Sequence, residues 1–445
     1  MNAFLFLVFG VSGVFVLTLI NPFLALPVFI FGHFVEPIQF FPELRQYNTQ
    51  LILGCAVLGA WLLHIIFTGN FVAANNRLVA PVILFIGWTF ICMKLGTHGT
   101  WYLQSMFLIN IIPFFVFLYM INTRKQLISI IWVLLIMGVI ASVYGLYCVR
   151  ANIGVSDGGL VRITSFMANP NAFGKTLAFL IPISICLILS KYHFFVKLIL
   201  AFVVFMMITG VVISYSRTSM IAMLLSLIIT PMMYYKGSKK LVAFLITLLI
   251  MPLLYYGFPL DRVKWKAHNR LVSIFEAESA AEVDLGRVET AKAGWIMMRE
   301  NPVFGVGIGG FGHEYYDLAQ RLSDLELVES RYEERGLSAH NLYVQVGGQL
   351  GVIGLALYLF LVLLAFINAI AAERRFFENG DSTLYAISRS IKIFIIVFMI
   401  TGITSSGLES KIFWIFAAIG VVLCKLSNMQ IDEEEEYSVS VKAKA

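Results

Sequence analysis

Long apolar runs separated by short polar segments follow one another along almost the whole chain. A helix needs roughly 20 mostly apolar residues to cross a bilayer. The predicted spans are 3–20, 23–36, 49–68, 78–95, 104–121, 127–148, 172–190, 196–213, 219–235, 241–257, 342–371, 388–406 and 411–427. The first two are short and are divided by Asn21-Pro22, so the count is about 12, or 13 if both cross. Because lipid offers the backbone no hydrogen-bond partners, the pattern predicts an all-α polytopic integral membrane protein.

One long polar stretch, residues 258–340, interrupts the apolar pattern. Within it, apolar residues at 288, 291, 295 and 298 recur at helical spacing, which predicts an amphipathic helix on the membrane surface. That helix should end near Asn301-Pro302, because the residue before a proline disfavours helix. The predicted regions are an N-terminal transmembrane bundle (1–257), one large loop (258–340), C-terminal transmembrane helices (341–427) and an acidic tail (428–445) that we expect to be solvated and disordered.

Clusters of lysine and arginine in short loops mark the cytoplasmic side of a membrane protein. Four clusters fall on alternate loops, and therefore on one side: Arg124-Lys125, Lys191 with Lys197, Lys236 with Lys239-Lys240, and Arg374-Arg375. The large loop then lies on the outer side, the C-terminus is cytoplasmic, and a count of 12 spans places the N-terminus there too. The chain is 59% hydrophobic and 13% charged, with a mean hydropathy of +0.86. The basic loops explain its net charge of +6 without a nucleic acid partner.

The sequence contains no pattern typical of a cofactor site. All five cysteines fall inside predicted spans, which argues against a disulfide framework. The motifs CxxC, HExxH and Asp-x-Asp are absent, and the seven histidines do not cluster at metal-ligand spacing. Residues 305–310 read G-x-G-x-x-G, but no strand precedes them, so they predict a tight turn with close backbone contacts and not a dinucleotide site. We therefore expect neither a metal nor another cofactor.

An arginine with several hydroxyl neighbours lies at the predicted outer surface, in Ser214-Tyr215-Ser216-Arg217-Thr218-Ser219. An arginine at a membrane boundary is often only an anchor whose charge reaches the water. The bias of basic residues toward the cytoplasm disfavours that interpretation on this side. A guanidinium grips phosphate oxygens with two parallel bonds, and neighbouring hydroxyls such as that of Ser216 strengthen the grip. Arg217 is therefore a candidate for binding an anion.

A histidine stands where the chain re-enters the membrane, in Ala339-His340-Asn341-Leu342-Tyr343. An ordinary histidine pKa of about 6.5 allows the imidazole to act as a base near neutral pH. A purely structural role is the alternative, since Asn341 is well suited to cap the following helix. His340 is thus a candidate catalytic base.

Two further arginines belong to the outer side. Arg162 precedes Asn169-Pro170-Asn171, a strong signal for a turn and a helix start that explains the asparagines without a function. Arg287 lies in the predicted amphipathic helix, where a plain surface charge is the alternative. Taken together, several arginines and one histidine without a metal motif suit an anionic, membrane-embedded substrate. A lipid-linked sugar donor fits, because arginines would stabilise its departing pyrophosphate.

These motifs resemble those of the O-antigen ligase superfamily of bacterial membrane glycosyltransferases, best over residues 150–365. The matching pieces are Arg162…Asn169-Pro170-Asn171, Ser216-Arg217-Thr218, Arg287 followed by Trp295, Asn301-Pro302…Gly305-Val306-Gly307, and His340-Asn341…Gly348-Gln349-Leu350-Gly351. Each piece is weak alone, whereas their order around one large outer loop late in the chain is more specific.

The resemblance implies about 12 helices in the bacterial inner membrane, both termini in the cytoplasm, and an active site facing the periplasm. It implies metal-independent, inverting transfer of a glycan from undecaprenyl diphosphate to an acceptor hydroxyl. By motif, Arg217 and Arg287 would bind the pyrophosphate and His340 would activate the acceptor. Arg162, Asn171, Ser216 and Asn341 would contact the substrates.

The resemblance does not identify the acceptor, which could be lipid A-core, another glycan or a protein. A repeat-unit polymerase is therefore as good an interpretation as a ligase, and a protein O-glycosylation enzyme comes next. A lipid-linked glycan transporter is disfavoured, because its charges would lie at mid-membrane and here they lie at span ends. The peptidoglycan polymerases are another alternative. They rely on an aspartate in an outer loop, a role that Asp284 or Asp317 could fill. A non-catalytic scaffold would tolerate substitution of the three candidate residues.

Overall fold

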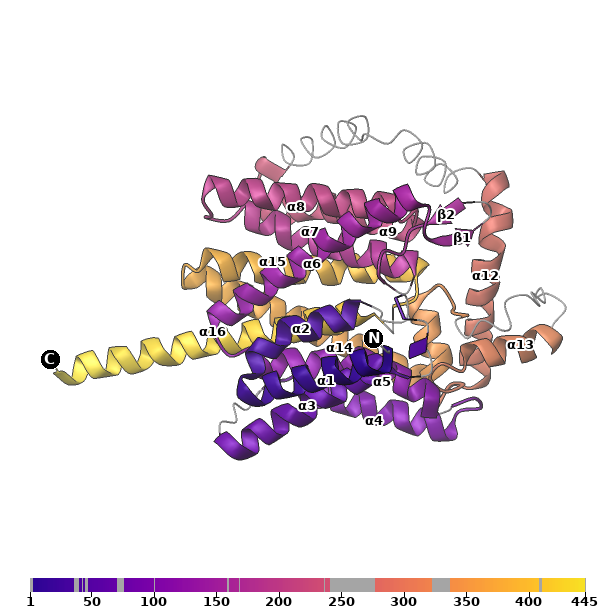
Figure 1. Cartoon of the computed structure of the whole chain (residues 1–445), viewed down its shortest axis with the longest axis horizontal. Coiled ribbons are helices and arrows are strands. Elements are labelled where there is room, and N and C mark those ends of the chain that lie inside the picture. The colour runs from indigo at the N-terminus through magenta and orange to yellow at the C-terminus, as the bar shows by residue number, and fades with distance from the viewer. Residues whose placement is uncertain are drawn as a thin grey trace.

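The chain forms a bundle of long helices with one helix lying across its end, as a computed structural model shows (Figure 1). The structure describes residues 3–35, 40–41, 43–44, 47–69, 76–99, 101–157, 160–167, 169–235, 237–240, 277–321, 337–407 and 410–444. Apart from helices, this part of the chain contains one short antiparallel hairpin of β1 (Val155–Asp157) and β2 (Leu160–Arg162). The all-α membrane architecture predicted from hydropathy is therefore present.

Most helices run along the bundle. They are α1 (Ala3–Ile20), α2 (Pro22–Phe34), α3 (Thr49–Thr68), α4 (Val79–Leu95), α5 (Trp101–Met120), α6 (Arg124–Ala151), α7 (Pro170–Ile188), α8 (Phe194–Ile213), α9 (Arg217–Tyr234), α14 (Leu342–Glu378), α15 (Ser382–Thr401) and α16 (Lys411–Lys444). Among the described helices, eight are long and apolar enough to cross a membrane, and α1, α2, α4 and α5 are shorter apolar ones. The predicted span 241–257 lies outside the described residues.

Two helices lie at one end of this bundle, which we call the α12 end. They are α12 (Ala277–Glu300), which crosses the ends of the other helices, and α13 (Phe311–Arg321) (Figure 1). Helix α12 ends at Glu300, one residue before Asn301-Pro302, as the sequence predicted. It packs on the first part of α14, where the carbonyl of Gly294 approaches Gly348.

The predicted basic loops meet at the opposite end, which we call the basic end. Arg124 forms an ion pair with Asp381, with Nε and Oδ2 2.6 Å apart. The hydroxyl of Tyr234 donates to the carbonyl of Leu189 at 2.7 Å. These contacts bring together the starts of α6 and α15 and the ends of α7 and α9. The prediction that the basic clusters share one side is confirmed for the described loops.

A buried ion cluster joins α14 to α15 at the basic end. Glu373 accepts from Arg389 Nε at 2.6 Å and also pairs with Lys392. The Arg389 guanidinium also lies over the rings of Tyr234 and Tyr385. Glu373 lies beyond the predicted span 342–371, because α14 runs on to Glu378. Helix α14 is therefore longer than hydropathy alone indicated.

The direction of the first helices follows from three side-chain contacts. His64 Nδ1, near the end of α3, lies 2.7 Å from the carbonyl of Leu19 at the end of α1. Gln50, at the start of α3, donates to the carbonyl of His33 at 3.1 Å. Lys411, at the start of α16, donates to Gln50 Oε1 at 2.8 Å. Helices α1, α3 and α16 therefore run in the same direction, and α1 begins at the α12 end.

The two termini consequently lie at opposite ends of the bundle, because α16 ends beyond the basic end (Figure 1). The expectation that the N-terminus and the C-terminus lie on the same side is therefore wrong. The physical reason is the break at Asn21-Pro22, which folds the first two apolar runs into the hairpin α1–α2. Asn21 caps α2 by accepting from Phe23 N at 3.0 Å, and Pro22 occupies a position where its missing N–H is not needed.

The C-terminal segment also differs from its prediction. Helix α16 continues through the acidic run to Lys444 and projects away from the bundle (Figure 1), whereas we expected a disordered tail. No glycine or proline follows Gly420, so nothing in the local sequence interrupts the helix.

Helix α14 is broken at Gly351, which has φ 69°. Because of the break, the backbone carbonyls just before Gly351 lose the N–H donors that a continuous helix would give them. Unpaired carbonyls are costly in apolar surroundings, so they need other donors. Three of them accept from outside the helix: Gly348 from Val306 N (2.9 Å), Gln349 from Gly307 N (3.0 Å) and Leu350 from Trp88 Nε1 (3.0 Å). The predicted tight glycine turn at 305–310 is thereby confirmed, and its function is to complete the broken helix.

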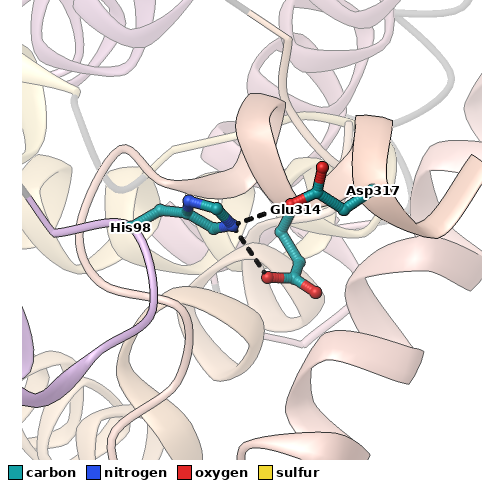
Figure 2. Close-up of side chains that lie close together, drawn as sticks. All are labelled: His98, Glu314 and Asp317. Atoms are coloured by element: carbon teal, nitrogen blue, oxygen red, sulfur yellow. Dashed lines mark ion pairs between the residues drawn. The ribbon is translucent and has the colours of Figure 1, made fainter.

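The loop after α4 packs on the same turn. A Cβ on Gly307 would lie 2.8 Å from the backbone of Gly99, and His98 N donates to the carbonyl of Val306 at 2.9 Å. This contact aims the His98 side chain at Glu314 of α13 (Figure 2). The loop thus joins the first half of the bundle to the α12 end.

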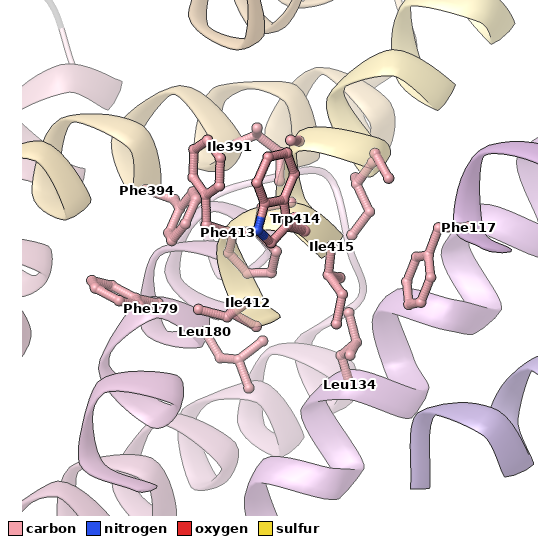
Figure 3. Packing of buried hydrophobic residues seen from close by; sticks show 14 of the residues in the cluster. Phe117, Leu134, Phe179, Leu180, Ile391, Phe394, Ile412, Phe413, Trp414 and Ile415 are labelled. Carbon is pink, nitrogen blue, oxygen red and sulfur yellow. The ribbon is translucent and has the colours of Figure 1, made fainter. Parts of the chain in front are cut away.

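Helix α16 occupies the centre of the bundle. Of its span, 83% is buried, compared with 17% for the peripheral α3. Trp414 is fully buried, and its ring lies within 6.5 Å of the rings of Phe85, Phe107 and Phe114. Figure 3 shows this side chain surrounded by apolar residues of several helices. Such close packing is what associates helices in a bilayer, where the hydrophobic effect between them is weak.

The break in α14 predicts a large difference between two glycine substitutions. Gly380→Ala, at φ 71° with nothing near a Cβ, should lower stability by about 1–2 kcal/mol, the penalty for a left-handed L residue. Gly351→Ala adds a Cβ only 2.1 Å from the carbonyl oxygen of Val303, which should lower stability by about 1–3 kcal/mol more. Melting temperatures of the detergent-purified variants measure this. Equal losses would contradict the need for the break.

Candidate active site

The polar motifs noted in the sequence meet at the α12 end. Arg162 Nη2 donates to Asn171 Oδ1 at 2.9 Å. The hydroxyl of Ser219 lies 3.4 Å from the carbonyl of Asn171 and 2.8 Å from the hydroxyl of Ser216. The structure therefore brings together Arg162, Asn171 and Ser216, which lie in two separate sequence motifs.

Two helices begin at this place because their first residues are good caps. Asn169 caps α7 by accepting from Ala172 N at 2.8 Å, with Pro170 in the first helical position. Ser216 caps α9 by accepting from Ser219 N at 3.3 Å. A Cβ on Gly174 would lie 2.6 Å from the Ser219 hydroxyl, so the two helix starts are close. Free N–H groups and the positive end of each helix dipole favour an anion there.

A lysine that the sequence analysis did not single out belongs to the same group. Lys175, on the second turn of α7, donates from Nζ to the hydroxyl of Ser405 at 2.7 Å and to the carbonyl of Ser406 at 3.1 Å. The 3-10 turn η4 (Gly402–Thr404) leads into these serines. The loop after α15 is therefore part of the site.

This loop links the arginine motif to the histidine motif. The hydroxyl of Thr218, next to Arg217, lies 3.5 Å from the carbonyl of Thr404. The hydroxyl of Ser406 donates to the hydroxyl of Ser338 at 2.8 Å, two residues before His340. A continuous series of contacts thus connects Arg217 and Lys175 with the segment that carries His340.

Asn341 has the capping role that was the alternative to substrate binding. Its Oδ1 accepts from the backbone N–H groups of Tyr343 at 3.0 Å and Val344 at 3.1 Å, and so begins α14. The hydroxyl of Tyr343 donates to the carbonyl of Met399 at 2.7 Å, which ties the start of α14 to α15. His340 is half-buried and sits directly before this cap.

Three residues of these motifs have left-handed backbones. In the described part of the chain, the non-glycine residues with positive φ are Ser165 (55°), Tyr215 (49°), His340 (49°) and the helix-ending Asn152. Such a conformation costs about 1 kcal/mol or more and persists only where surrounding contacts hold it, often at functional sites. Burial also raises the pKa of Tyr215 to about 12, so its hydroxyl stays protonated at physiological pH.

Two arginines complete the cationic character of this end. Arg217 is the first residue of α9 and only 8% exposed. Arg287 is half-buried on α12, two turns before Gly294. Arg217, the hydroxyls and the two helix starts lie together and can bind a phosphate-bearing group. Arg287 lies at the same end of the bundle, on α12.

A second group of polar side chains lies at the α12 end. His98 Nε2 is 3.1 Å from Glu314 Oε2 and 3.3 Å from Asp317 Oδ2 (Figure 2). Sequence reasoning found no metal-ligand spacing, because His98 is more than 200 residues away from its partners. The spacing of Glu314 and Asp317 on one helix face is the signal that it missed.

Part of the chain matches a known protein family. Residues 202–359 match the family model described as O-antigen ligase. No curated protein matches the chain. The matched range contains Arg217, Arg287 and His340, whereas Lys175 and the loop after α15 lie outside it.

Proposed function

The chain belongs to the O-antigen ligase superfamily, and on this premise we propose that it moves a glycan from undecaprenyl diphosphate to an acceptor hydroxyl at its α12 end. The observation that carries the proposal is the series of contacts from Arg217 through the loop after α15 to the segment before His340. This series supports the proposal because it connects the segment of a buried cation, Arg217, with Lys175 and with the segment of a potential base.

The donor diphosphate would bind between the cations. Arg217 and Arg287 would take its oxygens, and Lys175 would add a third positive charge from α7. The starts of α7 and α9 add partial positive charge in the same region. As the glycan departs, the diphosphate gains negative charge, and preorganised cations stabilise that change more than they stabilise the bound donor. The chain's own groups can thus supply this stabilisation, which supports a metal-independent reaction.

His340 would act on the acceptor. The acceptor hydroxyl gives its proton to the imidazole while its oxygen attacks the anomeric carbon of the donor glycan. The bond from that carbon to the diphosphate oxygen breaks with its electron pair, and undecaprenyl diphosphate leaves. Attack from the side opposite the leaving group inverts the anomeric configuration. The backbone of His340 is left-handed, a conformation that persists only where surrounding contacts hold it.

The α12 end would face the periplasm of the bacterial cell. The basic clusters at the other end support this orientation, because short cytoplasmic loops are rich in lysine and arginine. Termini at opposite ends of the bundle require an odd number of crossings, which favours 13 spans over 12. The N-terminus would then be periplasmic and the helical C-terminus cytoplasmic.

Cells without this protein test the proposal directly. Lipid-linked glycan should accumulate, and the wild-type gene should remove it. Full-length polymer left on the carrier would indicate a ligase, and single repeat units would indicate a polymerase. A glycan missing from a protein would indicate protein O-glycosylation. Normal levels of carrier-linked and transferred glycan would refute the proposed transfer.

Lys175 offers a sharper test of donor binding. Lys175→Met removes the charge and its two hydrogen bonds, which should raise the donor KM by about tenfold or more. Purified enzyme with a synthetic polyprenyl diphosphate glycan provides the measurement. Lys191→Met, at an exposed position of the basic end, is the matched control and should leave KM unchanged. An unaltered KM in Lys175→Met, with an unaltered melting temperature, would remove Lys175 from the donor site.

A further inference from the structure

The His98 cluster lies outside the proposed transfer chemistry and has its own geometry. One imidazole nitrogen and two carboxylate oxygens, from His98, Glu314 and Asp317, all lie within 4.8 Å of one another. They come from the loop after α4 and from one face of α13, and Figure 2 shows both carboxylates turned toward the ring. The three atoms therefore converge on one small space.

Their separations match those around a metal ion. Zinc bonds to nitrogen and oxygen are about 2.0–2.2 Å, so neighbouring ligands of a tetrahedral site lie roughly 3.4 Å apart. The two distances from His98 Nε2 are 3.1 Å and 3.3 Å. The two carboxylate oxygens lie within 4.8 Å of each other, so the three atoms could approach one ion together. An imidazole with two carboxylates suits a borderline divalent ion better than calcium or magnesium, which prefer oxygen alone.

The charges of the cluster leave room for a dication. Arg321 pairs with Glu300 at 2.9 Å and is farther, at 3.7 Å, from Glu314. Two acidic side chains thus face a single imidazole. Glu314 is 7% exposed, and a buried carboxylate needs a compensating charge. A bound divalent ion would add to the compensation that Arg321 gives.

The surroundings hold the candidate ligands in place. Thr97 Oγ1 donates to Glu314 Oε2 at 3.1 Å, a contact of the kind that orients metal-binding carboxylates. The His98 ring stacks on His313 with centroids 5.8 Å apart, and its backbone N–H is bound to Val306. The ligands are therefore preorganised by the chain itself.

We propose that His98, Glu314 and Asp317 bind one Zn²⁺ ion that fastens α13 to the first half of the bundle. The apolar face of α13, including Phe311 and Tyr315, packs with Ala339, the residue before His340. The ion would thus hold α13, which packs against the segment of His340, in place. It would not contact the reacting groups. Its removal should lower the melting temperature and reduce turnover far less than loss of His340.

Metal content of the purified full-length protein tests the site. The protein, free of any histidine tag, is stripped with EDTA, dialysed against Zn²⁺ with excess Mg²⁺, and analysed by mass spectrometry of the elements. We expect about one zinc per chain and a higher melting temperature with zinc than without it. Asp317→Asn, at a half-exposed position that should not disturb folding, should weaken zinc binding roughly tenfold or more.

His193→Ala is the matched control, because it removes an exposed histidine at the basic end, far from the cluster. It should retain one zinc and the zinc-dependent rise in melting temperature. Absence of bound zinc in the wild type, or zinc binding as tight as that of the wild type in both Asp317→Asn and His98→Asn, would overturn the proposal. In that case the three side chains form an ion-pair network only.

Discussion

His340→Asn is expected to slow glycan transfer by at least about 10²-fold while the protein remains folded, because the acceptor hydroxyl loses its base. Asparagine tolerates the left-handed backbone of this position, φ 49°, better than alanine does. The substitution therefore removes the imidazole with little strain. Turnover of purified variants with a lipid-linked donor measures the effect, and melting temperatures report folding. Wild-type turnover in His340→Asn would eliminate the assignment of His340 as the base.

A second substitution separates a chemical role from a structural one. His340→Gly also accepts positive φ, and it leaves space where the ring was. Free imidazole added to this variant should restore part of the lost activity if the ring acts as a base. His313→Ala, on the same end of the bundle, should transfer at a rate close to that of the wild type. No rescue together with a lowered melting temperature would instead indicate a structural role.

Hydropathy was sufficient to predict the membrane helices, because a bilayer allows apolar segments little choice of structure. The predicted 49–68 span coincides with α3, and the caps Asn169 and Asn341 begin α7 and α14 as their motifs indicated. Helix ends were less accurate. Helix α15 begins at Ser382 and not at 388, because Asp381 caps it by accepting from the backbone N–H groups of Thr383 and Leu384. Hydropathy does not detect such a cap.

Parts of the candidate site depend on contacts between distant segments and could not be predicted in this way. Lys175 at the start of an apolar run resembles an ordinary anchor until the loop after α15 is seen to bind it. Ser405 and Ser406 form a short polar loop without periodicity. The His98 cluster depends on how residues 96–99 pack against the glycine turn. In contrast, Arg217 was conspicuous in sequence because basic residues are uncommon on the outer side.

Substitution of Arg217, in the cationic group at the α12 end, is expected to have the second large effect on transfer. Arg217→Lys keeps the charge but loses the planar fork that can hold two phosphate oxygens at once. Since the side chain is only 8% exposed, water cannot easily replace the lost contacts. We expect kcat/KM for the donor to fall about 10²-fold, the loss typical of removing one preorganised donor from a transition state. Arg150→Lys, exposed near the end of α6, is the control and should behave as the wild type.

How that loss divides between kcat and KM will reveal what Arg217 does. If the guanidinium mainly stabilises the departing diphosphate, kcat falls and KM changes little. If it binds donor and transition state equally, KM rises and kcat is preserved. Because Arg217 is the first residue of α9, the helix dipole and the side chain would act on the same oxygens of a bound diphosphate, and charge that develops there would benefit from both. We therefore expect the fall in kcat, and an unaltered kcat/KM would exclude Arg217 from the reaction.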